Sequence, residues 1–405
     1  MKFKYLFDRL TRRNTIGNTN VMTVSARNGL INQESFFNKS IASEDLSGYY
    51  LLECGDFAYN KSYSDGYNFG AFKQLTCCDC GVVSPLYICF SVSEKNKCPE
   101  FYAHYFESCL LDREIKAFAQ EGARNHGLLN IAIGDFFSMP VPLPPLPEQR
   151  AIAKILTAAD KLIAVKDRLI AAKRRQKRWL MQNLLTGKVR LPGFGGEWET
   201  VRVDELFTIL SSLPLSRSEL TEMGHCYLHY GDIHKMQRFC VDVCSYFDKP
   251  RAKVADPKND VLLLDGDIVC VNASEDYDGV CKYVTIKNND NIPFISGLHT
   301  IHLRSTNTKI DNAFKEFCFQ NPIVRKQMLG LSTGMKVYGL SKVAILKLRI
   351  PLPPLPEQRA IAQILATADR EIELLTRGLE QHKLYKKYLT QQLLTGKIQV
   401  KGTAQ

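Results

Sequence analysis

The feature of this 405-residue chain that most constrains its fold is a long internal repeat. The string PLPPLPEQRAIA occupies residues 142–153 and returns at residues 351–362, an offset of 209 residues. The match continues without gaps to LLTGK, which ends at Lys188 and Lys397, and 26 of 47 positions are identical. The repeats of solenoid proteins are much shorter, about 20 to 50 residues. The repeat therefore predicts two copies of a domain-plus-helix unit.

Weaker similarities precede each repeated block. GDFAYN from Gly55 resembles GDIVCVN from Gly266, and each reads as a Gly-Asp turn followed by a β-rich run. FYAHYF from Phe101 and FKEFCF from Phe314 are predicted to begin helices. The variable parts are therefore expected to share a mixed α/β fold with a curved sheet. The predicted boundaries are residues 1–140 and 197–350 for the two domains, and residues 141–190 and 351–397 for the helical blocks.

Each repeated block is predicted to form one long helix. Pro147 and Pro356 suit a first helical turn, where no amide hydrogen is needed, and Gly187 and Gly396 suit a left-handed C-terminal cap. A helix of about 38 residues is about 57 Å long. A single amphipathic helix of that length is poorly stable alone, so we expect the two to pack together. The alternative, that each merely covers its own domain, leaves the length unexplained.

Residues at alternating spacings of four and three mark the seam expected of a coiled coil. The apolar members are Ile152, Leu156, Ala159, Ile163, Ile170, Leu180 and Leu184 in the first copy, and Ile361, Leu365, Ala368, Ile372, Leu375, Leu379, Leu389 and Leu393 in the second. In the first copy three lysines, Lys166, Lys173 and Lys177, dilute the middle of the seam. Ile155, Leu162 and Leu169 are expected to widen its apolar face.

Positive charge is concentrated in one of these helices. The chain has 53 Lys plus Arg against 42 Asp plus Glu, and residues 146–190 alone carry 12 basic and 3 acidic side chains. The densest run is AAKRRQKRW at residues 171–179. Such a run can face phosphate or an acidic protein partner, or it can be a solvated helical face. Charge alone leaves these possibilities open.

Composition excludes several classes of protein. With 45% hydrophobic residues the chain can bury cores, which excludes a disordered chain, and no apolar run approaches the roughly 20 residues that span a bilayer. The opening MKFKYLFDRLTRRN has no continuous apolar stretch of a secretory signal, so we expect a cytoplasmic protein without membrane association. The 13 cysteines are therefore expected to be reduced thiols.

No constellation typical of a catalytic or metal site stands out. CCDC at residues 77–80 has the spacing of half a zinc knuckle, but no convincing second pair follows it. TGK at residues 186–188 lacks the glycine-rich lead of a phosphate-binding loop. Asp265 and Asp267 are expected to shape a turn. We therefore predict no catalytic residue, no metal ligand and no cofactor bound by this chain.

Taken together, these sequence features resemble those of a known protein family. Two variable domains alternating with near-identical proline-led helices, PLPPLPEQRAIA to LLTGK, closely resemble the DNA-specificity subunit of type I restriction-modification systems. The strings GDFAYNKSYSDGYNFGAFKQL and GVVSPLYICF in the first domain are also similar to this family. One departure is that GEWETVRVDELF opens the second domain, whereas the first starts abruptly at MKFKYLFDRL. A short leading strand is either absent there or supplied by the other end of the chain.

The resemblance implies a fold and a role. Each variable domain would be a target-recognition domain reading half of a bipartite site in double-stranded DNA, and the helices would form an antiparallel coiled coil with pseudo-twofold symmetry. Two methyltransferase subunits would dock on the chain, together with ATP-dependent restriction and translocation subunits for cleavage. S-adenosylmethionine, ATP and magnesium would be bound by those partners. A rod of about 57 Å corresponds to roughly 17 base pairs, enough to separate two half-sites.

Neither domain is net basic, so DNA contacts are expected from local clusters and polar loops, in which Asn and Arg can bond base edges. In the first domain the candidates are Arg12, Arg13, Asn60, Lys61, Ser62, Tyr63, Tyr67, Arg124, Asn125 and His126. In the second they are Lys235, Arg238, Asn272, Ser274, Tyr277, Lys282, Met335, Lys336 and Tyr338. Each of them individually can also be an ordinary solvated loop residue.

Two other functions compete with this interpretation. One is a coiled-coil adaptor whose basic helix organises proteins without reading DNA. The other is a self-sufficient DNA-modifying enzyme, which is disfavoured because no glycine-rich cofactor loop precedes an Asn-Pro-Pro-aromatic motif.

Overall fold

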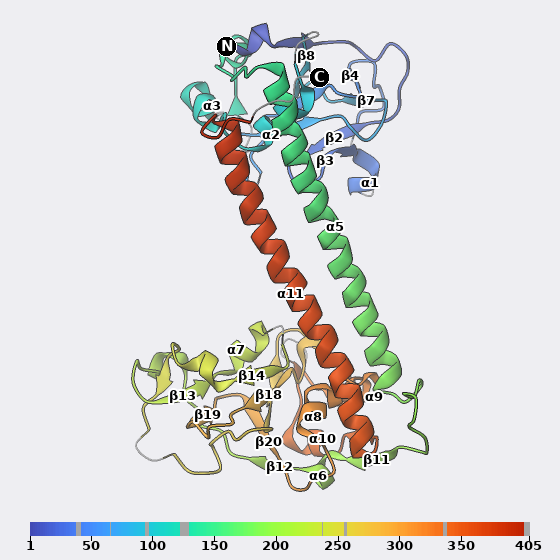
Figure 1. Ribbon diagram of the computed structural model, residues 1–405, viewed down its shortest axis with the longest axis vertical. Helices are drawn as coiled ribbons and strands as arrows, with labels where there is room; N and C mark the ends of the chain where they lie inside the picture. The colour runs from blue at the N-terminus through green and yellow to red at the C-terminus, as the bar shows by residue number, and fades with distance from the viewer. Residues whose placement is uncertain are drawn as a thin grey trace. The chain divides into compact units, whose positions relative to one another are not determined.

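The computed structural model describes residues 1–37, 42–64, 66–93, 97–121, 129–236, 238–254, 257–334 and 338–400. The chain divides into two compact units, one of Met1–Asp167 with Gly378–Gln405 and the other of Arg168–Arg377. Each unit contains one globular domain and a segment of both long helices (Figure 1). We call the residues before the first long helix the first domain, and those between the two long helices the second domain.

The first domain is built on a four-stranded antiparallel sheet in the order β1-β8-β5-β6. These strands are β1 (Phe7–Leu10), β8 (Ile88–Val92), β5 (Phe57–Asn60) and β6 (Ala71–Gln74). Three strand pairs accompany the sheet: β2 (Met22–Ser25) with β3 (Gly29–Asn32), β4 (Tyr50–Glu53) with β7 (Cys80–Val83), and β9 (Gln120–Glu121) with β10 (Leu129–Asn130). The helices are η1 (Phe3–Tyr5), α1 (Gln33–Phe37), α2 (Pro99–Glu107), α3 (Asp112–Phe118) and α4 (Ile133–Ser138).

The second domain repeats this strand order and adds to it. Its main sheet runs β12-β20-β16-β18-β14, with β12 (Phe207–Leu210), β20 (Thr300–Ser305), β16 (Ile268–Val271), β18 (Tyr283–Lys287) and β14 (Cys240–Asp242). The smaller sheets are β15 (Arg251–Ala252), β13 (His225–Leu228) and β19 (Phe294–Ser296) in that order, β11 (Glu199–Arg202) with β22 (Arg349–Leu352), and β17 (Ala273–Ser274) with β21 (Tyr338–Gly339). The helices are α6 (Val203–Leu206), η2 (Arg217–Glu219), α7 (Tyr230–Lys235), η3 (Val243–Tyr246), η4 (Tyr277–Gly279), α8 (Asn312–Cys318), α9 (Pro322–Leu331) and α10 (Lys342–Leu346).

The two domains therefore share a fold, as the weak similarities in the sequence predicted. The Gly-Asp turn before β5 and before β16 has the same construction, because Asp56 accepts a hydrogen bond from the amide of Glu53 and Asp267 from that of Leu264, both at 2.8 Å. The helices predicted from Phe101 and Phe314 are α2 and α8, which begin two residues earlier.

The repeated blocks are the long helices α5 (Leu146–Leu184) and α11 (Leu355–Leu394). None of the predicted seam residues is exposed. Leu162 and Leu169, by contrast, are 42% and 40% exposed and lie on the outer face, so they do not widen the seam as expected.

Ion pairs establish that the two helices run antiparallel. In the first unit Lys386 contacts Asp160, and in the second Lys173 contacts Glu371 at 2.8 Å and Lys177 contacts Asp369. Residue numbers on α11 fall as those on α5 rise, which confirms the antiparallel pairing. The alternative of two separate helices, each covering only its own domain, is excluded.

The ends of the long helices belong to the domain cores. The aromatic core of the first domain includes Ile152 and Leu156 from the start of α5, together with Leu393 from the end of α11. The core of the second domain includes Leu184 from the end of α5 and Ile361 from the start of α11. Each domain is thus built onto the beginning of one long helix and the end of the other.

Residues 1–3 occupy the position that β11 has in the second domain. β11 pairs with β22, and in the first domain Phe3 donates to the carbonyl of Met139 at 2.8 Å while Val141 donates to that of Met1 at 2.7 Å. The sequence left open whether a leading strand is missing or comes from the other end of the chain. In the structure the first residues themselves make the pairing. Among the described residues no helix is long and apolar enough to span a membrane.

Candidate nucleic-acid interface

The first candidate cluster lies in the loop that follows β5. The side chain of Asn60 accepts a hydrogen bond from the amide of Ser62, and the carbonyl of Lys61 accepts one from the amide of Leu129. Tyr63 is 62% exposed. The start of the loop is therefore held by hydrogen bonds while the ring of Tyr63 faces solvent. The candidates Arg124, Asn125 and His126 lie outside the described residues, immediately before Leu129.

Tyr67 closes this loop and connects it to α2. Its hydroxyl contacts the carboxylate of Glu107 at the end of α2, and the ammonium of the buried Lys73 contacts the same carboxylate. Burial, and then the hydrogen bond and charge of Glu107, raise the pKa of Tyr67. Tyr67 therefore remains a neutral phenol that positions the loop.

Arg12 and Arg13 make contacts within the first domain. The guanidinium of Arg12 lies 2.8 Å from Glu53 and 2.6 Å from Asp56, so it braces the Gly-Asp turn. The guanidinium of Arg13 contacts the carbonyl of Gly48 and lies 4.9 Å from the ring centroid of Tyr50. Both side chains are partly committed to the fold, and their role on DNA stays a prediction.

The second domain brings several of its candidates together beyond the C-terminal end of β16, the central strand of its main sheet. Ser274 in β17 pairs with Tyr338 in β21, and the rings of Tyr338 and Tyr277 lie 5.1 Å apart. The backbone of Asn272, directly after β16, accepts a hydrogen bond from Leu340, while its buried side-chain oxygen has no hydrogen-bond partner among the described residues. Met335 and Lys336 lie outside the described residues.

Lys282 lies beside this cluster. Its ammonium donates to the carbonyl of His234 at 2.7 Å, and the ring of His234 in turn contacts the carbonyl of Ala273 at 3.1 Å. Burial lowers the pKa of Lys282. Lys235, the next residue of α7, is exposed. The cluster therefore has a cationic side.

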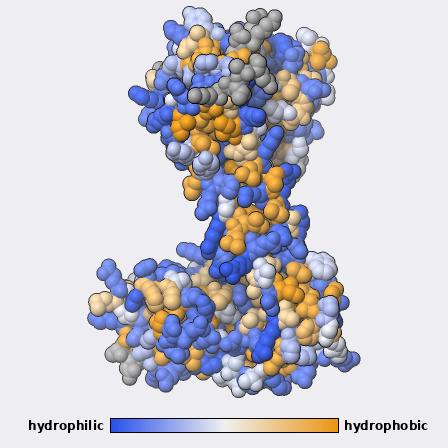
Figure 2. Space-filling view, in the orientation of Figure 1, coloured by the Kyte–Doolittle hydropathy of each residue, from blue (hydrophilic) through white to orange (hydrophobic). Residues whose placement is uncertain are grey.

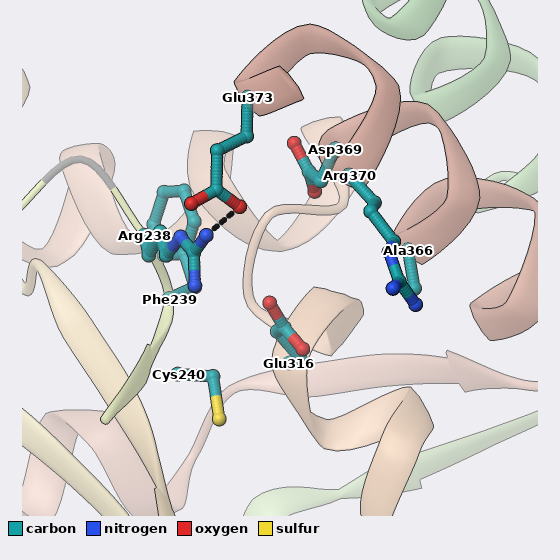
Figure 3. Close-up of a pocket in the computed structure, with 8 residues that line it drawn as sticks. All are labelled: Arg238, Phe239, Cys240, Glu316, Ala366, Asp369, Arg370 and Glu373. Atoms are coloured by element: carbon teal, nitrogen blue, oxygen red, sulfur yellow. Dashed lines mark ion pairs between the residues drawn. The ribbon is translucent and has the colours of Figure 1, made fainter. Parts of the chain in front are cut away.

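Arg238 lies elsewhere, against α11. It forms an ion pair with Glu373, beside a cavity of about 340 Å³ that is also lined by Glu316 and Asp369 (Figure 3). The sequence showed a basic residue in a loop but could not show its acidic partner on a distant helix. A role for Arg238 on DNA remains a prediction.

The sequence interpretation missed an aromatic and histidine group near the same end of β16. The ring of Tyr230 lies 5.3 Å from that of His299 and 6.3 Å from that of His234, and the carbonyl of His299 accepts a hydrogen bond from Asn272. His299 is exposed and has a left-handed backbone conformation with φ of 56°. No motif marks these residues, since separate segments of the chain contribute them.

The run of charge on α5 divides into two faces. Lys173 and Lys177 point into the seam and make ion pairs with α11, whereas Arg174, Arg175 and Arg178 are exposed. Three arginines on the outer face remain accessible to phosphate or to an acidic partner.

Among the described residues, the cysteine-rich segment has no counterpart that would complete a metal site. Cys77 and Cys78 lie with their sulfurs 3.9 Å apart, and Cys78 also contacts Asn20. Within the described ranges, no group of three or more His, Cys, Asp or Glu side chains is arranged to hold a metal ion.

Comparison with known proteins identifies the family. The model of the type I restriction modification DNA specificity domain matches the chain twice, at residues 14–172 and 195–382. Each match covers most of one domain and most of the long helix after it. The chain belongs to this type I specificity family. The internal repeat of this chain thus consists of two copies of the specificity domain.

Relatives of this specificity chain agree with the assignment. The specificity subunit of type I restriction enzyme MjaVIII from Methanocaldococcus jannaschii is 28% identical over 296 residues, which is 71% of this chain and 68% of that relative. The HsdS subunit from Thermoanaerobacter tengcongensis has the same fold, with 17% identity and a TM-score of 0.52 over 98% of this chain and 96% of that one. A chain from a structure on complex assembly and conformational transition of the type I R-M system has 17% identity and a TM-score of 0.58, over 98% and 97% of the two chains.

Proposed function

We propose that this specificity chain reads a bipartite DNA site, one half-site per domain, and brings methyltransferase subunits to it. The observation that carries the proposal is that one domain-plus-helix unit occurs twice, with the same strand order and a family match in each copy. Two readers with a shared scaffold but different loops suit two different short sequences, because base-edge contacts specify sequence while the scaffold sets orientation.

The chemistry is proposed to reside in the partners. Two methyltransferase subunits would methylate adenine with S-adenosylmethionine, and restriction subunits would use ATP and magnesium for translocation and cleavage in the cytoplasm of a bacterium or archaeon. The chain itself would supply binding and position alone, without a cofactor of its own.

The outer faces of the long helices are candidates for the methyltransferase contact. Figure 2 shows hydrophobic surface along these helices among hydrophilic residues. The exposed apolar residues there are Leu162, Val165, Leu169 and Trp179 on α5, and Leu374, Leu384, Tyr385 and Tyr388 on α11. Exposed apolar and aromatic side chains of this kind are typical of protein interfaces.

Methylome sequencing tests the proposal directly. A host strain expressing this chain with its modification partner should methylate adenines only within one bipartite motif. Competition binding with the assembled complex, at fixed salt because phosphate contacts are salt-dependent, should prefer that motif over random duplex. Equal affinity for both duplexes would favour the coiled-coil adaptor.

Helix length is expected to set the spacing of the half-sites. Four residues inserted between Asp167 and Arg168 and four between Arg377 and Gly378 would lengthen both helices by about 6 Å. The unread spacer of the methylated motif should then grow by one or two base pairs, at about 3.4 Å each. An unchanged spacer would contradict this role, and an insertion in one helix alone serves as the control that disrupts the pairing.

A further inference from the structure

A buried glutamine fastens the first domain to the start of α5. Gln149, from the repeated PEQ string, has no exposed surface. Its side-chain oxygen accepts a hydrogen bond from the amide of Cys98 at 3.0 Å, and its nitrogen donates to the carbonyl of Pro144 at 2.7 Å. Cys98 is the residue that caps α2. An amide at a helix start has no partner within the helix, so the glutamine satisfies it and fixes its position.

The second copy repeats this arrangement. Gln358, the counterpart of Gln149 at the 209-residue offset, is equally buried. It accepts a hydrogen bond from the amide of Asp311, the capping residue of α8, at 2.8 Å and donates to the carbonyl of Pro353 at 2.8 Å. The same glutamine therefore holds the start of the equivalent helix in both domains.

Two of the ion pairs between α5 and α11 are formed by residues at equivalent positions of the repeat. Asp160 and Lys177 on α5 stand at the repeat positions of Asp369 and Lys386 on α11, and each aspartate pairs with the lysine of the other helix. All four residues belong to the positions that are identical between the copies. The contact has thus been kept twice, although most of the middle of these helices has diverged.

Each of these two ion pairs also lies close to a residue of the neighbouring short helix, α2 in the first unit and α8 in the second. In the first unit His104 of α2 lies 3.7 Å from the carboxylate of Asp160. In the second unit the ammonium of Lys177 lies 5.9 Å from the ring centroid of Phe317 in α8. His104 and Phe317 are both the fourth residue of the matching strings FYAHYF and FKEFCF. Two attachment points thus hold each of these short helices.

The short helices lead from these contacts to the candidate DNA loops. Glu107 at the end of α2 binds Tyr67 and Lys73 beside the loop after β5. In the second domain the hydroxyl of Tyr283 donates to the carbonyl of Glu316 in α8 at 2.7 Å, and Tyr283 directly follows Lys282. A displacement of either short helix would therefore move its own loop.

We propose that two clasps position the recognition domains separately, each for its own half-site. The first clasp is Gln149, His104 and the Asp160–Lys386 pair, and the second clasp is Gln358, Phe317 and the Lys177–Asp369 pair. The inference rests on the proposed function, because it assigns these side chains as positioning residues for DNA reading. Base-edge hydrogen bonds tolerate only small errors of placement, so a loosened clasp should weaken sequence discrimination more than phosphate binding.

Glutamine variants test the proposal in the assembled complex with its methyltransferase. Gln149→Met and Gln358→Met keep the side-chain volume but leave a buried amide unsatisfied. Affinities would be measured for the correct site and for duplexes with one base changed in either half. We expect Gln149→Met to reduce discrimination by about tenfold in one half-site and by less than about twofold in the other. Gln358→Met should show the opposite pattern.

Charge reversal supplies a rescue that does not depend on the glutamines. Asp160→Lys places two lysines together and should affect the same half-site as Gln149→Met. Adding Lys386→Asp should restore discrimination to within about twofold, since the pair is re-formed with opposite polarity. The matched control, Asp369→Lys with and without Lys177→Asp, should act on the other half-site.

The outcomes separate the two proposals. If the variants melt at lower temperature but discriminate like wild type, or weaken both half-sites equally, the clasps are simple structural braces and the inference is overturned. If the wild-type complex itself has no preferred site, the proposed function fails and the inference fails with it. Half-site-selective losses that the reversed pair rescues would establish the clasps.

Discussion

At the scale of single residues, the aspartates of the two Gly-Asp turns, Asp56 and Asp267, have pKa values shifted in opposite directions. Asp267 is buried, and although burial alone would raise its pKa, hydrogen bonds from His302 at 2.8 Å and Arg304 at 2.6 Å hold the pKa below its ordinary 3.8. At Asp56 burial outweighs the partly exposed Arg12, and the pKa is raised. The carboxylate of Asp267 therefore stabilises its domain in the ionised form.

Asp267→Asn should lower the free energy of unfolding of the second domain by about 3 to 5 kcal/mol, because it leaves the partly buried guanidinium of Arg304 without its anionic partner. The stabilisation should be present above the ordinary pKa of 3.8 and be lost as pH falls through the lower folded value. Urea unfolding at pH 7 and pH 3 measures both effects. Asp56→Asn is the matched control and should cost much less, and equal losses would contradict the assignment.

His104 gives the first unit a pH dependence that the second unit lacks at this position. Burial, and also Lys386, lower the pKa of His104 below 6.5, while Asp160, Glu107 and Glu100 oppose the shift. The pKa of His104 is therefore lower in the folded state than in the unfolded state. The free energy of unfolding should be unaffected by this histidine above pH 6.5 and should decrease as pH falls below 6.5.

His104→Phe should remove that part of the pH dependence, because phenylalanine has no titratable group. Phenylalanine is chosen because the second domain carries Phe317 at the equivalent position. Melting temperatures of wild type and variant between pH 5 and pH 8 provide the measurement. The curves should diverge only on the acidic side, and parallel curves would show that His104 does not titrate in this range.

At the scale of elements, the two long helices end in the same way. Gly187 and Gly396 both have φ of 71°, and Val189 and Ile398 each donate to the carbonyl of the residue six positions earlier. The left-handed caps expected at these glycines are present. A side chain at Gly187 would meet Trp198 at an ordinary 3.5 Å, and one at Gly396 would meet nothing within 4 Å.

Alanine at either cap should therefore cost about 1 to 2 kcal/mol, which is the price of the left-handed backbone for an L residue. Hydrogen exchange should report the loss in the last helical turn of the affected copy alone. Asparagine at the same position tolerates this conformation better and should cost less. A cost that differs strongly between the two glycines would indicate a packing effect instead.

The sequence predicted these elements because their signals are local. Proline, glycine and the heptad spacing each act within a few residues, so the helix limits and the buried seam could be anticipated. The partners of Gln149 and Arg12 could not, since Cys98 and Glu53 lie about 40 to 50 residues away and only the folded domain brings them near. Nor could the spacing place Leu162, because an apolar residue at a seam boundary fits either face.

At the scale of the whole molecule, the uneven distribution of charge predicts how binding depends on salt. Arg174, Arg175 and Arg178 are exposed on α5, while the neighbouring lysines are engaged with α11. Replacing the three arginines by glutamine should reduce the slope of log affinity against log salt by up to about 3, if each meets one phosphate. Site discrimination should change little, because phosphate contacts carry no sequence information.

Titrations of the assembled complex at several salt concentrations measure that slope. Removing three exposed charges at Lys342, Lys347 and Arg349, around α10, provides a charge-matched comparison. An unchanged slope together with weaker methyltransferase binding would show that the arginines face a protein partner instead.

The exchanged ion pairs also bear on how such a chain can originate. Asp160 and Lys177 lie on one helix, so two antiparallel copies of α5 alone would match each aspartate to a lysine of its twin. A single polypeptide thus contains the two equivalent Asp–Lys contacts that a homodimer of such helices would form. Duplication and fusion of an ancestral gene would have required no new contact at these positions, and each copy could then diverge in its loops while remaining compatible with the other.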